Sequence, residues 1–304
     1  MYELIIVGGG PAGMAAAVYA ARKRLNTLLI SVDIGGQMNW TTGVENYLGY
    51  QFIEGQELIS KFQQQVNQFP IDHKVGQKVI QLKKIDSEFE VVCESTDKFQ
   101  SKAILLASGK RPRRLNVQGE AELTGRGVTY CAVCDGPIFA GQKVAVIGGG
   151  NSALEAALDM VKIAEHVDLV SFTPLTGDPI LIEKLSDAKN LTFYLKYQTE
   201  MILGKNLVDG IVIKELETGK KYQLDVTGVF IEIGLVPNSD MVKDSIKLNQ
   251  NNEVPVNCYC ETEIPGLFAA GDVTTVPEKQ IVIAAGEGAK AALQAHRYLQ
   301  RLTK

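Results

Sequence analysis

The sequence has few cysteines, little excess charge and no long apolar run, and each shortage narrows the possible functions. Five cysteines among 304 residues are too few, and odd in number, for the disulfide framework of a small secreted protein. A net charge of −4 does not indicate nucleic acid or an acidic membrane as partner. No apolar stretch could span a bilayer, and Met1 leads directly into a strand pattern, without room for a signal peptide. We therefore expect a cytoplasmic protein that binds neither nucleic acid nor membranes.

Metal-binding and hydrolase patterns are also missing. The three histidines, His73, His166 and His296, are scattered, and neither a Gly-x-Ser-x-Gly elbow nor a P-loop occurs. A structural zinc site usually needs two Cys-x-x-Cys pairs, and the sequence contains one. We expect no metal centre and interpret the histidines as structural or surface residues.

Glycine, in contrast, occurs twice in one pattern, with the two copies 140 positions apart. The first copy runs from Leu4 to Gly13 and the second from Val144 to Ala153. In each copy a short apolar run precedes Gly-x-Gly-x-x-Gly/Ala, and a helix-favouring stretch follows, which is the dinucleotide-binding fingerprint. The glycines allow a tight turn and close approach of the pyrophosphate, which the helix N-terminus faces.

The two copies predict an α/β fold with two similar nucleotide-binding domains. Residues 3–32 and 143–172 each read as strand, glycine turn, helix and strand. Residues 111–120 are polar and resemble a linker. Further strands are expected at Phe89–Cys93, Ala103–Leu106, Leu191–Leu195, Val208–Glu215 and Val229–Ile233.

The last predicted strand, Gly266–Asp272, ends in an aspartate, and a helix is expected from about Gln280 to Gln300. A carboxylate at a strand end near a helix suits hydroxyl recognition on a bound sugar or ribitol. The alternative role of Asp272 is a helix N-cap. Spacing alone leaves both interpretations open.

The pair Cys131-x-x-Cys134 permits three interpretations. A redox dithiol is favoured in a cytosolic protein beside βαβ units. The alternatives are half of a zinc site or two unrelated buried thiols. Asp135 supports redox chemistry, because a partly desolvated carboxylic acid can supply a proton when a disulfide is reduced. Its alternative role is to cap the turn before Gly136.

Taken in order, these motifs resemble those of the low-molecular-weight thioredoxin reductase family over essentially the full length. The matching elements are Gly8–Gly13, Gly35-Gly36-Gln37, Val44-Glu45-Asn46, Cys131–Asp135, Gly148–Ala153, Gly271-Asp272 and Lys279-Gln280-Ile281. From about Cys134 onward the chain is also similar to the flavoprotein reductase of the alkyl hydroperoxide reductase system. That reductase has an additional N-terminal thioredoxin-like region, which is missing here. We therefore expect any thioredoxin-like partner to be a separate protein.

The resemblance implies a homodimeric, FAD-dependent disulfide oxidoreductase with two three-layer, Rossmann-like domains, the second inserted in the first. The FAD domain would comprise residues 1–114 and 247–304, and the pyridine-nucleotide-type domain, residues 115–246, would carry the cysteine pair. The implied FAD-site residues are Gly8, Gly10, Pro11, Ala12, Gly13, Gly35, Gly36, Gln37, Asn46, Gly271, Asp272, Lys279, Gln280 and Ile281. Asp272 would bind the ribitol, and Gln280 would lie near the flavin ring.

In the same family pattern, Cys134 would face the flavin, Cys131 would attack the substrate disulfide and Asp135 would donate the proton. The second nucleotide would lie on residues of the second glycine turn and the strand after it. These residues are Gly148, Gly150, Asn151, Ser152, Ala153 and Ser171.

One departure from the family bears on the electron donor. NADPH-using members carry a His-Arg-Arg run after the second strand of the inserted domain, whereas residues 171–177 here contain no basic residue. The NADH-using relative has an acid where Ser171 stands, and that acid is also missing. Three explanations stay open: weak NADH binding, slightly favoured over NADPH; a vestigial site with electrons from a ferredoxin-like protein; or another nucleotide, such as a second flavin. A non-catalytic, redox-sensing flavoprotein is a less favoured alternative.

Overall fold

The computed structural model describes residues 1–40, 43–44 and 46–302, and the chain divides into two compact units. Unit 1 contains Met1–Arg111 and Val236–Lys304, and unit 2 contains Pro112–Leu235. The boundaries expected from the sequence, 114/115 and 246/247, both lie later in the chain than the boundaries of these units, 111/112 and 235/236. The segment after Val236 belongs to unit 1 because Val242 and Ile246 are buried in its core.

Unit 1 is built on a mixed sheet with the strand order β5-β2-β1-β8-β7-β6, in which β19 also pairs with β8. Its first four strands and β19 are parallel, whereas β6, β7 and β8 form an antiparallel meander. The strands are β1 (Tyr2–Gly9), β2 (Thr27–Ile34), β5 (Asp72–Val75), β6 (Val79–Ile85), β7 (Glu88–Cys93), β8 (Lys98–Leu106) and β19 (Leu267–Ala269).

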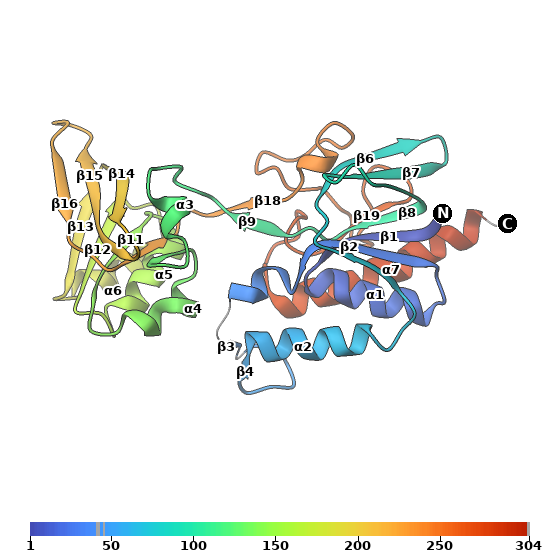
Figure 1. The fold of residues 1–304 in the computed structure, drawn as a ribbon, viewed down its shortest axis with the longest axis horizontal. Coiled ribbons are helices and arrows are strands. Elements are labelled where there is room, and N and C mark those ends of the chain that lie inside the picture. Colours follow the sequence, from blue (N-terminus) through green and yellow to red (C-terminus); the bar gives the residue numbers. More distant parts are fainter. Residues whose placement is uncertain (41–42, 45, 303–304) are drawn as a thin grey trace. The chain divides into compact units, whose positions relative to one another are not determined.

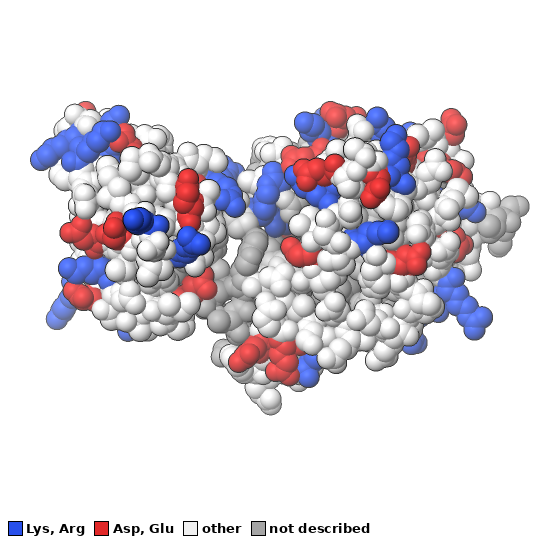
Figure 2. All heavy atoms as spheres, viewed as in Figure 1, with Lys and Arg blue, Asp and Glu red and all other residues white. Residues whose placement is uncertain are grey.

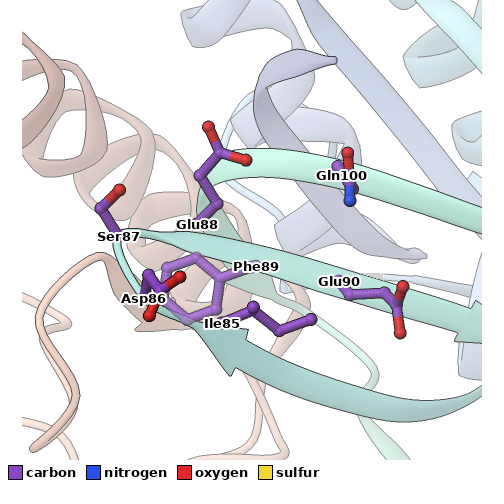
Figure 3. A pocket seen from close by; sticks show the side chains of 7 residues that line it. All are labelled: Ile85, Asp86, Ser87, Glu88, Phe89, Glu90 and Gln100. Carbon is purple, nitrogen blue, oxygen red and sulfur yellow. The ribbon is translucent and has the colours of Figure 1, made fainter.

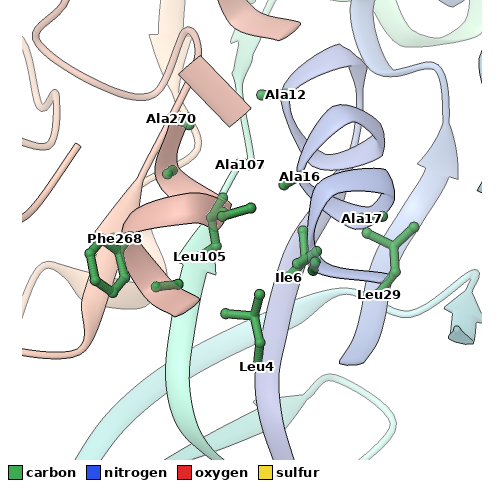
Figure 4. Close-up of a cluster of buried hydrophobic side chains, with 14 of the residues drawn as sticks. Leu4, Ile6, Ala12, Ala16, Ala17, Leu29, Leu105, Ala107, Phe268 and Ala270 are labelled. Carbon is green, nitrogen blue, oxygen red and sulfur yellow. The ribbon is translucent and has the colours of Figure 1, made fainter. Parts of the chain in front are cut away.

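The central strand β1 is apolar through its middle because both of its faces are buried. Leu4 and Ile6 pack beneath two helices, α1 (Pro11–Arg22) and α7 (Ile281–Leu302), which lie side by side on one face of the sheet (Figures 1 and 4). Ile5 and Val7 point to the opposite face, where β6, β7 and the segment from Val242 to Val273 supply the other half of the core. Side chains of β1 thus alternate between two covered faces of the sheet, so unit 1 has three layers.

Unit 2 repeats the plan with a parallel sheet in the order β10-β17-β11-β12-β13. Helices α5 (Asn151–Met160) and α6 (Pro179–Ser186) cover one face, and an antiparallel sheet, β14-β15-β16, covers the other (Figure 1). The strands are β10 (Val128–Thr129), β11 (Lys143–Ile147), β12 (His166–Ser171), β13 (Leu191–Leu195), β14 (Tyr197–Gly204), β15 (Val208–Glu215), β16 (Lys221–Leu224) and β17 (Gly228–Ile231). The predicted α/β class with two Rossmann-like, three-layer domains is confirmed.

Short elements complete the chain. Residues 111–120, expected to be a linker, overlap strand β9, which pairs with β18 where the chain returns, and they meet helix α3. The remaining elements are η1 (Gly36–Trp40), β3 (Gly43–Val44), β4 (Ile53–Glu54), α2 (Gly55–Val66), β9 (Lys110–Pro112), α3 (Glu120–Leu123), α4 (Ala132–Asp135), η2 (Gly136–Phe139), β18 (Leu235–Pro237) and η3 (Asp240–Val242).

The surface carries charges of both signs. Figure 2 shows Lys and Arg interspersed with Asp and Glu on the viewed face of each unit. A small pocket of about 160 Å³ lies at the β6–β7 hairpin, lined by Ile85–Glu90 and Gln100 (Figure 3). None of the predicted site residues lines this pocket. In the part of the chain that the structure describes, no helix is both long and apolar enough to cross a membrane.

Candidate functional site

The first glycine turn connects β1 to α1 and is held by close backbone packing. Gly8 has a φ of +116°, and a Cβ atom there would lie 2.2 Å from the carbonyl oxygen of Ala107. A Cβ on Gly13 would lie 1.8 Å from the carbonyl oxygen of Gly8. Since real Cβ atoms essentially never approach this closely, both positions need glycine for the fold itself.

Gly10 differs from these two glycines because it faces open space. The nearest atom to a Cβ on Gly10 would be the carbonyl oxygen of Gly35, 3.9 Å away. Gly10 is also the N-cap residue of α1, whose N-terminus has no side-chain cap. An uncovered helix N-terminus beside a residue without a side chain fits the pyrophosphate of a dinucleotide such as FAD.

The loop after β2 is tied to this turn. Ser31 Oγ accepts a hydrogen bond from the Gly9 amide at 2.7 Å and donates to the Asp33 carbonyl at 2.5 Å. The Gly35 amide donates to the Gly9 carbonyl at 2.9 Å, and the Gly36 amide donates to Asp33 Oδ1 at 3.0 Å. The predicted run of Gly35, Gly36 and Gln37 therefore begins beside the first glycine turn.

Two hydrogen bonds join residues that are far apart in the sequence. Gln37 Nε2 donates to Asp272 Oδ2 at 2.8 Å, and Asn46 Nδ2 donates to Gln280 Oε1 at 3.1 Å. Burial raises the pKa of Asp272, although Gln37 and nearby lysines oppose this shift. Because α7 begins only at Ile281, Asp272 is not its N-cap, so the capping alternative is wrong.

Lys279, another predicted FAD-site residue, contacts backbone carbonyl groups and the carboxylate of Glu253. Its Nζ donates to the carbonyl oxygens of Thr274 and Val276 and lies 3.6 Å from Glu253 Oε1. Burial lowers the pKa of Lys279. Lys110 lies 2.8 Å from the same carboxylate oxygen. Lys279 is therefore fixed by a network that involves unpredicted residues.

Another unpredicted residue is Glu287, which lies on the buried side of α7. Its Oε2 accepts a hydrogen bond from the Gly271 amide at 2.8 Å, and burial raises its pKa. Glu287 thereby fixes the turn that carries Asp272. The available sequence signal was an isolated acid on an alanine-rich helix, but the pattern could not name its backbone partner.

The cysteine motif follows β10 and forms the single turn α4. Cys131 is disulfide-bonded, whereas Cys93, Cys258 and Cys260 are free thiols. The side chain of Cys134 lies outside the described residues. The observed disulfide at Cys131 agrees with the redox interpretation of the motif and disagrees with two unrelated thiols.

Asp135 is oriented by a hydroxyl group. Thr129 Oγ1 donates to Asp135 Oδ2 and accepts a hydrogen bond from the Cys131 amide at 3.2 Å. Asp135 precedes η2 without a side-chain capping bond, so its alternative role as a turn cap is wrong. The carboxylate of Asp135 is therefore coupled, through one hydroxyl, to the backbone of Cys131.

The second glycine turn, in unit 2, repeats the geometry of the first. Gly148 has a φ of +144°, and a Cβ there would lie 2.3 Å from the Glu232 carbonyl oxygen. Gly150 is open, with its nearest neighbour, Thr176 Oγ1, 4.0 Å from an added Cβ. Ala153 is fully buried in the first turn of α5, as packing of helix against strand requires, while the neighbouring Ser152 is exposed.

The loop that should read the ribose folds against this turn. Ser171 is buried at the end of β12, beside Gly149. The Thr176 amide donates to the Gly149 carbonyl at 2.7 Å. Asn151 and Asp178 exchange two hydrogen bonds, at 2.7 and 3.1 Å. The predicted Asn151 is therefore joined to an acid that the sequence pattern did not single out.

A comparison with known proteins decides the family. The family model described as pyridine nucleotide-disulphide oxidoreductase matches residues 2–288. The chain belongs to this family. Like other members, this disulphide oxidoreductase is expected to bind FAD, and the predicted FAD-dependent enzyme class is confirmed.

Proteins similar to this disulphide oxidoreductase include an alkyl hydroperoxide reductase component and thioredoxin reductases. The F component of alkyl hydroperoxide reductase from Staphylococcus aureus (strain MSSA476) is 40% identical over 301 residues, which cover 99% of this chain and 59% of that protein. The chain thus spans about 59% of the length of this curated relative. Thioredoxin reductase of Lactococcus lactis is 34% identical with a TM-score of 0.81, covering 99% of this chain and 100% of that chain. Thioredoxin reductase of Streptococcus pyogenes MGAS5005 is 35% identical with a TM-score of 0.76 and 99% coverage of both chains. The predicted resemblance to both groups is confirmed.

Proposed function

We propose that this FAD-dependent oxidoreductase transfers electrons from NADH to a disulfide between Cys131 and Cys134, and from that pair to the disulfide of a thioredoxin-like protein. The observation that carries the proposal is the disulfide at Cys131 in a Cys-x-x-Cys turn, within a unit that also contains a dinucleotide-type glycine turn. Cytoplasmic location stays a prediction from the composition of the sequence, and homodimerisation stays a prediction from the resemblance.

FAD would supply a two-electron carrier, and unit 1 offers the residues to hold it. Gly10 and the α1 N-terminus would accommodate the pyrophosphate, Asp272 would accept hydrogen bonds from the ribitol, and the Asn46–Gln280 pair would border the flavin. This assignment is supported by the open space at Gly10 and by the hydrogen bonds that hold the side chains together.

The cysteine chemistry proposed here is thiol–disulfide exchange. In the reduced pair, the Cys131 thiolate attacks one sulfur of the partner disulfide, and the other partner sulfur leaves as a thiolate and takes up a proton. Cys134 then attacks the mixed disulfide, which releases the second partner thiol and restores the Cys131–Cys134 bond. Asp135, held by Thr129, is the proposed proton donor when the internal disulfide is reduced.

NADH is the favoured donor because of the charge around the second glycine turn. A 2′-phosphate is usually bound by arginines in bidentate contacts, but residues 171–178 contain no basic side chain. Asp178 places an acid beside Asn151 at this turn. An acid disfavours the additional phosphate of NADPH and leaves a nucleotide with free ribose hydroxyls as the better fit.

Replacement of one cysteine tests the proposal. Cys134→Ser should lower NADH-dependent reduction of a thioredoxin-like disulfide by at least about 1000-fold, because the mixed disulfide cannot be resolved and no Cys131–Cys134 disulfide can form to receive electrons. Flavin absorbance should be unchanged. Cys258→Ser, at an exposed free thiol, serves as the matched control and should retain full activity. Wild-type activity in Cys134→Ser would refute the assignment.

A second candidate is a pyridine-nucleotide-independent oxidoreductase that receives electrons from ferredoxin or from a second bound flavin. The observation favouring it is that the loop of Thr176 and Asp178 is hydrogen-bonded to the Gly149 carbonyl and to the side chain of Asn151, so the Asn151 amide is already paired with a carboxylate and is not free for a nucleotide. Fast flavin reduction by NADH at micromolar concentration would exclude this candidate. A redox-sensing role without catalysis would be excluded by steady turnover with any donor.

A further inference from the structure

A carboxyl group that the sequence pattern did not reveal lies beside the cysteine motif. Glu232 directly follows β17, and its backbone carbonyl borders Gly148 of the second glycine turn. Its side-chain Oε1 accepts a hydrogen bond from the amide of Ala132, at 3.4 Å. Ala132 is the first residue between the two cysteines, so the carboxylate is hydrogen-bonded to the backbone of the redox turn itself.

The surroundings of Glu232 do not compensate its charge. Burial and, more weakly, the like charge of Glu155 on α5 raise the pKa of Glu232 to about 7, and the Ala132 amide only partly opposes this. The acid on α4, Asp135, bonds to Thr129 instead. Among the described residues, no lysine or arginine forms an ion pair with Glu232. When Glu232 is ionised, its charge thus has no ion-pair partner among the described residues that would neutralise it.

We propose that Glu232 is a positioning residue for the redox pair, whose carboxylate disfavours the thiolate of Cys131 and so controls when that sulfur becomes nucleophilic. A like charge beside a thiol raises the pKa of the thiol, and only the thiolate attacks a disulfide. When Glu232 takes up a proton, this repulsion disappears. When Glu232 is ionised, Cys131 stays a thiol over a wider pH range.

This inference rests on the proposed function of the cysteine pair, but its test does not require turnover. The full-length protein is reduced with dithiothreitol, freed of reductant and alkylated with iodoacetamide at a series of pH values. Peptide mass spectrometry then gives the alkylation rate of Cys131 separately from that of the exposed Cys258. Since only the thiolate reacts, the midpoint of the rate against pH reports the ionisation of Cys131.

Glu232→Gln keeps a hydrogen-bond acceptor for Ala132 and removes the charge, so the midpoint of Cys131 should fall by about one pH unit. Glu232→Asp, which keeps the charge, should leave the midpoint near the wild-type value. Glu122→Gln, at an exposed carboxylate of the same unit, is the control and should change nothing. Flavin absorbance and the thermal midpoint verify folding of each variant.

An unchanged midpoint in Glu232→Gln would overturn the proposal, and so would an equal shift in Glu232→Asp, because the effect would then come from packing. The two proposals can fail separately. If the wild-type protein reduced no protein disulfide, while Glu232→Gln still lowered the Cys131 midpoint, the proposed reductase activity would be refuted and the role of Glu232 in thiol ionisation would stand.

Discussion

At the scale of single residues, glycines in one fingerprint serve two different purposes. Gly8 and Gly13 have backbone oxygens where a side chain would be, whereas Gly10 has open space. A sequence pattern treats all three as one motif. The structure separates the two positions that the fold requires from the open position, where we propose that the ligand lies.

Paired substitutions in the first turn test this distinction. Gly13→Ala should lower the free energy of unfolding by about 1–3 kcal/mol, since α1 must move away from the Gly8 carbonyl. Gly10→Ala should leave the stability of the apoprotein within about 0.5 kcal/mol and weaken FAD binding about tenfold or more, because a methyl group would occupy the phosphate position.

Denaturant unfolding of the apoproteins and flavin titration measure the two effects separately. A Gly10→Ala protein that binds FAD as tightly as the wild type would show that the pyrophosphate does not pass over this residue. Equal stability of Gly13→Ala and wild type would show that the close contact is not retained in solution.

At the scale of elements, the contact between α1 and α7 is unusually close. A Cβ on Gly288 of α7 would lie 1.9 Å from the Ala12 carbonyl of α1, and the helix surface around it is rich in alanine. Gly271, in the turn that carries Asp272, also faces Ala12, with a Cβ 3.1 Å away. The distance between the helices therefore sets the position of the predicted FAD-site turn.

Two glycines of α7 provide a matched pair for testing this packing. Gly288→Ala should destabilise unit 1 by about 1–3 kcal/mol, because the helices must separate. Gly286→Ala, where nothing lies within 4 Å of an added Cβ, should be neutral or stabilise by up to about 1 kcal/mol through helix propensity. Thermal unfolding compares the two, and equal effects of both substitutions would contradict the close packing.

Elements whose signal is local were predictable from the sequence. The strands Leu191–Leu195 and Val208–Glu215 have the predicted bounds, and α7 begins one residue after the predicted start, because apolar runs and their bounding polar residues lie next to each other in the chain. Strand β14 and helix α2 were not predicted. Each is only partly buried, so neither has a continuous apolar pattern.

At the candidate site, too, local features were predictable and long-range contacts were not. The glycine turns and the cysteine pair were predictable because each is a short motif of neighbouring residues in the chain. Glu232 and Glu287 were not, since their roles come from backbone partners 100 and 16 positions away. The Gln37–Asp272 bond spans 235 positions. Family resemblance named both residues, but only the fold shows that they meet.

At the scale of the whole molecule, the two units divide the tasks of the proposed enzyme. Unit 1 contains the residues proposed to hold FAD, and unit 2 contains the second glycine turn and the redox cysteines. Each unit has its own core on both faces of its own sheet. The proposed function therefore requires that electrons from a nucleotide reach the cysteines of unit 2.

An anaerobic titration with NADH, followed by flavin absorbance, tests that claim most directly. The wild-type flavoprotein should take up about two equivalents of NADH, because the cysteine disulfide accepts one electron pair in addition to that of the flavin. Cys134→Ser should take up about one, and NADPH should act only at much higher concentration. Indifference to NADH, with bleaching by reduced ferredoxin or dithionite, would contradict the account, and so would an equal uptake of NADH by both proteins.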